Sequence, residues 1–151
     1  MGLAMANQKF NEVKINKVAV VVAAIPYFAM GYPWFAFFRD AWFYGGGLTV
    51  EQLLEGPSYA VAFGVAIGGA LVTSYVLALL MAMTGTRTAV GGMGIAALGW
   101  LGFTAAVMAT QYTFEARSPG YFGVTAGYPL LALLIMGAIL GAWPGRSKHE
   151  D

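Results

Sequence analysis

The chain alternates long uncharged hydrophobic stretches with connections that carry the charged residues, and four such stretches occur. The hydrophobic stretches cover residues 18–38, 59–83, 89–114 and 120–143. Each is at least as long as the roughly 20 residues with which an α-helix crosses a hydrocarbon core about 30 Å thick. The pattern therefore predicts an all-α membrane protein, a bundle of four transmembrane helices.

The last stretch has the clearest boundaries. Pro119 suits the first position of a helix, Tyr121 and Trp143 suit the two headgroup zones, and Pro144-Gly145 should end the helix. The first stretch is less regular, because it contains Pro26 and Pro33. Each proline removes a backbone donor, so we expect this helix to be kinked or to end before Trp34.

The connections between the stretches also carry signals. Thr49-Val50-Glu51-Gln52 is typical of a capping box and predicts a short surface helix over residues 50–54. The polar turn 84–88 is so short that we expect the second and third spans to be antiparallel neighbours. Gln111 is the most polar side chain of any span, and we expect it to bond a neighbouring helix.

Composition supports a membrane location. Hydrophobic residues make up 59% of the chain, charged residues only 10%, and the mean hydropathy is +0.68, whereas soluble domains carry about 25% charged residues. We assign residues 18–145 to one bundle domain between a basic tail, 1–17, and a short tail, 146–151. Lysine and arginine are scattered singly, which argues against a nucleic-acid partner.

Basic residues near the span ends indicate the orientation. Six would lie on the side of the two termini: Lys9, Lys14, Lys17, Arg87, Arg146 and Lys148. Arg39 and Arg117 would lie on the opposite side. This bias predicts that both termini are cytoplasmic.

The chain contains few side chains that could act in catalysis. The single histidine, His149, lies in the C-terminal tail, and there is no cysteine. None of the four spans contains Asp, Glu, Lys or Arg, the groups through which proton-coupled transporters usually work. We therefore expect no enzyme, no cofactor and no metal site.

One group of polar and aromatic residues is a candidate site, because the topology places its members at one membrane interface. Its members are Trp34, Arg39, Asp40, Trp42, Gln111, Tyr112, Glu115, Arg117 and Tyr128. The aromatic residues are typical of an interfacial belt, and a platform on which a ligand stacks is the alternative. The charged residues could cross-pair, Arg39 with Glu115 and Arg117 with Asp40.

Small residues recur at the spacing with which membrane helices pack closely. The candidate packing positions are Gly64, Gly68, Ala66, Ala70, Gly123, Gly127, Gly137 and Gly141. One bundle hardly needs so many close-approach faces. We therefore favour an accessory or stabilising subunit that packs against other membrane proteins or itself within the lipid. The alternative is a binder or carrier of a small hydrophobic molecule, such as a quinone, carotenoid or lipid.

The order of residues resembles that of a known family. The resemblance lies in Phe114-Glu115-Ala116-Arg117, Gly127-Tyr128 and residues 134–143, and in Gly31-Tyr32-Pro33-Trp34-Phe35 and residues 38–42. The chain is similar to small bacterial four-span membrane proteins catalogued as a domain of unknown function, which implies the bacterial inner membrane as its location. Pro129 stands where that family often has histidine, and Phe37 where it often has proline.

Overall fold

The computed structural model describes residues 15–143, and within that range every regular element is helical. In chain order the elements are α2 (Lys17–Phe37), α3 (Arg39–Phe43), α4 (Val50–Leu54), α5 (Tyr59–Thr84), α6 (Ala89–Trp100), the π-helical segment η1 (Leu101–Ala105), α7 (Ala106–Phe114) and α8 (Pro119–Ala142). The predicted tails, the stop at Pro144-Gly145 and His149 lie outside the described residues, apart from residues 15–17.

Four helices are long and apolar enough to cross a membrane: α2, α5, the continuous run α6–η1–α7, and α8. Their bounds differ from the predicted spans by no more than one residue at either end. The prediction of a four-helix, multi-pass membrane protein is therefore confirmed.

Each long helix begins at a polar side chain that accepts hydrogen bonds from the first backbone amides. These caps are Asn16, Ser58, Thr88 and Ser118. The capping box is also present, because Thr49 accepts from the amide of Gln52 and the Gln52 side chain accepts from the amide of Thr49. Short polar caps thus fix where each hydrophobic segment starts, because they satisfy amides that have no partner within the helix.

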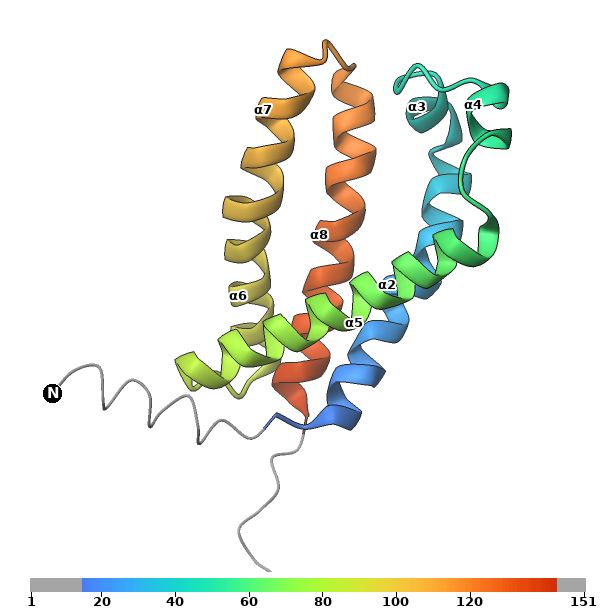
Figure 1. Ribbon diagram of the computed structural model, residues 1–151. Helices are drawn as coiled ribbons and strands as arrows, with labels where there is room; N and C mark the ends of the chain where they lie inside the picture. Colours follow the sequence, from blue (N-terminus) through green and yellow to red (C-terminus); the bar gives the residue numbers. More distant parts are fainter. Residues whose placement is uncertain (1–14, 144–151) are drawn as a thin grey trace, which may run out of the picture.

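The bundle has two distinct ends (Figure 1). The start of α2, the turn at Thr86 and the end of α8 lie together at what we call the Thr86 end. α3, α4 and the turn between α7 and α8 lie at the opposite, Arg117 end. Both described chain ends thus lie at the Thr86 end, as the predicted sidedness requires. Their cytoplasmic location stays a prediction.

The helix α8 lies between α2 and the α6–α7 run, and α5 crosses obliquely in front (Figure 1). The core lies toward the Thr86 end and consists of Ala23, Leu77, Met81, Ala96 and Met136. The predicted pairing of the second and third spans holds only near their turn, where Met81 Cε lies against Gly92. Farther along, α5 diverges toward α2.

The prolines of α2 do not end the helix. α2 continues through Pro26 and Pro33 to Phe37, so the expectation that it could end before Trp34 is wrong. In a membrane helix the freed backbone groups are satisfied by neighbouring helices, and proline is tolerated more readily there than in water.

Candidate functional site

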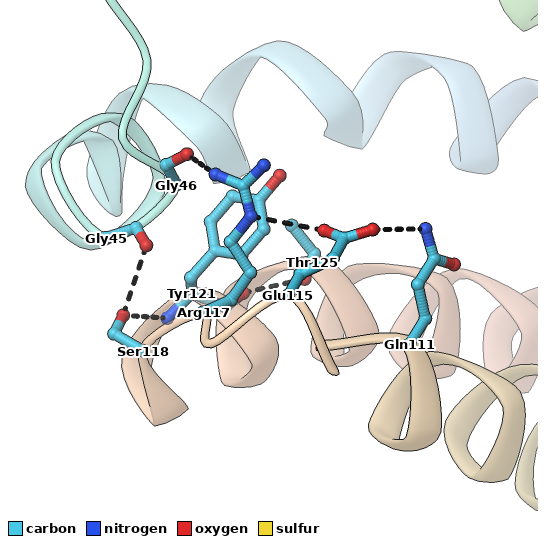
Figure 2. Close-up of polar contacts among 8 residues, drawn as sticks. All are labelled: Gly45, Gly46, Gln111, Glu115, Arg117, Ser118, Tyr121 and Thr125. Carbon is cyan, nitrogen blue, oxygen red and sulfur yellow. Dashed lines mark hydrogen bonds and ion pairs between the residues drawn. The ribbon is translucent and has the colours of Figure 1, made fainter. Parts of the chain in front are cut away.

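Arg117 organises the polar contacts at the Arg117 end (Figure 2). Its Nε donates to Glu115 Oε2 at 3.2 Å, and its Nη1 donates to the carbonyl oxygen of Gly46. The guanidinium carbon also lies 5.7 Å from the centre of the Tyr121 ring. One side chain thus joins the turn between α7 and α8 to the loop that follows α3.

Glu115 is held from two sides. Gln111 Nε2 donates to Glu115 Oε1 at 2.9 Å, and Arg117 occupies the other carboxylate oxygen. The hydrogen bond from Gln111, and then that from Arg117, lower the pKa of Glu115 below its ordinary value, because both donors favour the ionised carboxylate. Ala116 has a positive φ of 52°, which turns the chain tightly between the two partners.

Two predictions about these residues are wrong. In the part of the chain that the structure describes, the ion pair is Arg117 with Glu115, and neither Arg39 nor Asp40 cross-pairs with them. Among the described residues, the Gln111 side chain bonds Glu115, one turn farther along the chain, and no neighbouring helix. The reason is local geometry, since residues four apart on a helix face each other and the Ala116 turn brings Arg117 back over Glu115.

The loop after α3 docks on the start of α8. Ser118 caps α8 by accepting from the amide of Tyr121 at 3.1 Å, and its hydroxyl lies 3.4 Å from the carbonyl oxygen of Gly45. A Cβ at Gly45 would lie 2.7 Å from Ser118 Oγ, and one at Gly46 would lie 2.6 Å from the Tyr121 ring. The two glycines therefore let the loop lie directly on α8.

The aromatic members of the predicted site fall into two groups. Tyr128 lies between α2 residues, with its ring centre 6.5 Å from Trp34 and 5.4 Å from Phe35, which in turn lies 5.4 Å from Trp42. Tyr112 instead packs on α8, 5.2 Å from Tyr121. The structure thus brings together Trp34, Trp42 and Tyr128, and places Tyr112 beside Arg117.

Sequence reasoning missed the hydrogen bonds that join the helices. Each runs from a side chain to a backbone carbonyl oxygen of another helix: Trp34 Nε1 to Val124 (3.0 Å), Trp100 Nε1 to Ala126 (2.9 Å), Ser74 Oγ to Val20 (2.8 Å), and the Tyr128 hydroxyl to Tyr27. Any helix offers such carbonyls, so no residue pattern marks the acceptor. The available signal was the donor alone, a tryptophan, tyrosine or serine inside a span.

Two shallow grooves lie at the Arg117 end. One lies between α7 and α8 and is lined by Ala109, Tyr112, Thr113, Arg117, Ser118, Pro119 and Phe122. The other runs along α2 and is lined by Ala29, Met30, Pro33, Trp34, Phe37 and Phe38. Within residues 15–143 no group of three or more His, Cys, Asp or Glu side chains is placed to hold a metal ion.

The predicted packing glycines differ in what they face. Gly137 lies against the backbone of Gly92, and Gly141 against that of Thr88, so this pair serves contact between α6 and α8. Gly127 faces the Trp34 ring, whose Cζ2 would lie 3.3 Å from an added Cβ.

The remaining candidates lie on α5 and at the start of α8. A Cβ at Gly64, Gly68 or Gly123 would meet nothing within 4 Å. On α5, Ala70 is buried, whereas Ala66 is exposed. Only part of the predicted small-residue surface is thus used inside the chain.

Comparison with known proteins places the chain in a family. No curated protein and no solved structure matches it. Residues 18–141 match the family described as proteins of unknown function (DUF1761), and the match covers all four membrane helices almost completely. The chain therefore belongs to the DUF1761 family, whose function is unknown.

Proposed function

We propose that this protein is a non-catalytic subunit of the bacterial inner membrane that stabilises an assembly, packing against other membrane proteins or its own copies through α5. The observation that carries the proposal is the open pair Gly64 and Gly68, where an added Cβ meets nothing within 4 Å. Residues 59–69 of α5 are all exposed. A long span thus keeps a glycine pair on a surface that the described part of the chain does not use.

The glycine pair faces away from the helix's own packing surface. The buried residues of α5 are Ala70, Ser74, Leu77 and Met81, which form one stripe. At 3.6 residues per turn, Gly64 and Gly68 point roughly 130° away from the centre of that stripe. A partner helix could therefore lie on them without displacing α2 or α8. Close backbone approach at such positions is the usual basis of helix association in lipid.

The test is a pair of matched double variants. Gly64→Leu with Gly68→Leu fills the proposed surface, and Gly94→Leu with Gly99→Leu fills positions that are equally open on α6. Native mass spectrometry after mild extraction from the host membrane measures assembly size. We expect the α5 variant to lose the partner and the α6 variant to keep it. A partner retained by the α5 variant, or a wild-type protein that is monomeric, would contradict the proposal.

The groove along α2 favours a second candidate, a binder of a small hydrophobic molecule. Its lining is apolar, and the Trp34 indole is already bonded to Val124, so recognition there would rest on stacking and apolar contact. Phe37 is 82% exposed, so Phe37→Ala tests the groove without removing a buried side chain from the bundle. Loss of a co-purifying compound at unchanged assembly size would support this candidate.

A further inference from the structure

We infer that the first part of α8, Pro119–Tyr128, is an arm that pivots at Pro129 and is latched to the neighbouring helices by the Trp34 and Trp100 indoles. This conformational device is independent of the proposed subunit role. It rests on three observations: a proline inside α8, two hydrogen bonds beside the carbonyl that this proline leaves free, and a difference in packing between the two halves of α8.

The proline provides the pivot. Pro129 lies inside α8 and has no amide hydrogen, so the carbonyl of Thr125 lacks the donor that an ordinary residue would supply four positions later. Gly127 lies between them and adds backbone freedom. Proline within a helix is a common site of bending, so α8 is weakest between Thr125 and Pro129.

The two indoles bond the carbonyls on either side of Thr125, whose own carbonyl the proline leaves without a donor. Trp34 of α2 donates to the carbonyl oxygen of Val124 at 3.0 Å, and Trp100 of α6 donates to that of Ala126 at 2.9 Å. The two acceptors flank Thr125 in the sequence. Both bonds end on the arm and begin on other helices, so they hold it against helices on its two sides (Figure 1). Next to the pivot, the Tyr128 hydroxyl adds a bond to the carbonyl oxygen of Tyr27 of α2.

The helix that supplies Trp100 is also irregular there. The π-helical segment η1 begins at Leu101, directly after Trp100. Such π-bulges interrupt the regular hydrogen-bond register and often mark functional positions. α7, which follows η1, contacts α8 far less than α6 does. The regular helical hydrogen-bond pattern is thus interrupted near Trp100 on both sides, by η1 after α6 and by Pro129 within α8.

Packing separates a fixed half from the arm. Beyond the pivot, α8 is held by backbone contact of Gly137 with Gly92 and by the buried Met136. On the arm, the buried residues are Val124 and Ala126, whose carbonyl oxygens accept the two latch bonds, whereas no residue of Pro119–Gly123 and none of α7 is buried. At its far end the arm is joined to the loop at Gly45-Gly46, a glycine-rich connection that can move with it.

Distance measurement between spin labels tests the inference, and the chain is suited to it because it contains no native cysteine. Labels at Val18→Cys, at the start of α2, and at Gly123→Cys, on the arm, report the arm relative to the Thr86 end. Val18 is 63% exposed, and a Cβ at Gly123 meets nothing within 4 Å. Pulsed electron–electron double resonance measures the distance between the labels in the full chain, in lipid nanodiscs.

Two kinds of substitution should change the width of the distance distribution in opposite directions. Trp34→Phe and Trp100→Phe keep an aromatic ring but lose the indole donor, so each should broaden the distance distribution. Pro129→Ala restores a donor for Thr125 and should narrow it. Trp42→Phe is the matched control, because the Trp42 indole makes no hydrogen bond among residues 15–143, and it should leave the distribution unchanged.

A second label pair, Val18→Cys with Val90→Cys, lies wholly in the fixed half and should not respond to any of these changes. An altered distance for that pair would show that a variant disturbs the whole bundle, and would overturn the assignment of a separate arm. Unchanged distributions in both Trp34→Phe and Trp100→Phe would overturn the latch. A broader distribution in Pro129→Ala would overturn the pivot.

Discussion

Gly92 and Gly137 lie backbone against backbone where α6 crosses α8. A Cβ on either residue would collide with the carbonyl group of the other. Backbone atoms cannot turn aside as a side chain does, so this contact tolerates only glycine without a shift of a whole helix. A close contact between α6 and α8 is thus made by a glycine pair, of which only Gly137 was predicted.

Alanine at either position of this contact should therefore destabilise the bundle. We expect Gly92→Ala and Gly137→Ala each to lower the free energy of unfolding by about 1–3 kcal/mol, the usual cost of overpacking. The measurement is reversible unfolding in mixed micelles. Gly94→Ala is the control, because a Cβ there meets nothing within 4 Å and alanine favours helix. Equal stability of the Gly92 and Gly94 variants would contradict the contact.

Ser74 is the one polar side chain fully buried among the described residues, and it bonds the backbone of α2. Its hydroxyl donates to the carbonyl oxygen of Val20 at 2.8 Å. Ser74→Ala should cost about 0.6 kcal/mol, and no more than about 1.7, as other hydrogen bonds between membrane helices do. Thr110→Ala is the comparison, since its hydroxyl bonds only its own helix, at Ala106. A larger loss in Thr110→Ala would be inconsistent with this role of Ser74.

The span boundaries could be predicted because they depend on local signals. Arg39 and Glu115 follow the first and third hydrophobic stretches and Gly85 caps the second, while polar caps such as Thr88 and Ser118 begin the helices, so no knowledge of distant contacts is needed. The helix ends at Phe37 and Phe114 follow from the same logic. The position of each helix along the chain is thus determined largely by the residues at its own two ends.

The contacts between helices could not be predicted in the same way. Gly64-x-x-x-Gly68 and Gly137-x-x-x-Gly141 look alike in sequence, yet within residues 15–143 only the second pair packs against another helix. The difference depends on how far α5 tilts away from its neighbours. Arg117 likewise pairs within its own turn because of the backbone at Ala116, which no charge pattern reveals.

Because of Glu115, the stability of the folded protein should depend on pH in the acidic range. Hydrogen bonds from Gln111 and Arg117 lower its pKa in the folded protein, whereas the unfolded carboxyl keeps its ordinary value near 4.5. The stabilisation is therefore complete above that ordinary value and is lost as the pH falls through the lower, folded value. Melting temperature, followed from pH 7 down to pH 3, measures the effect.

The control for this prediction is Glu115→Gln, which keeps the shape of the side chain but does not titrate. At pH 7 we expect the wild type to melt slightly higher than the variant, because the carboxylate is exposed and its ion pair is largely screened. The difference should shrink below pH 4.5. A gap that stays constant down to pH 3 would show that the Glu115 carboxylate does not contribute through its charge.

Arg117 should hold the loop after α3 because its guanidinium group has several nitrogen donors. One nitrogen serves Glu115 and another serves the carbonyl oxygen of Gly46, two acceptors on different segments. Lysine carries the same charge on a single nitrogen, so Arg117→Lys should keep at most one of these contacts. We expect faster amide hydrogen exchange in residues 44–48, by roughly fivefold if the lost bond contributes about 1 kcal/mol.

Arg39→Lys is the matched control for the exchange experiment. Arg39 carries the same group at the same end of the bundle, and it has no ion-pair partner in the described part of the chain. Its variant should leave exchange in residues 44–48 unchanged. Equal protection of the loop in Arg117→Lys and in the wild type would mean that the glycine contacts with Ser118 and Tyr121 hold the loop by themselves, and that the guanidinium is dispensable there.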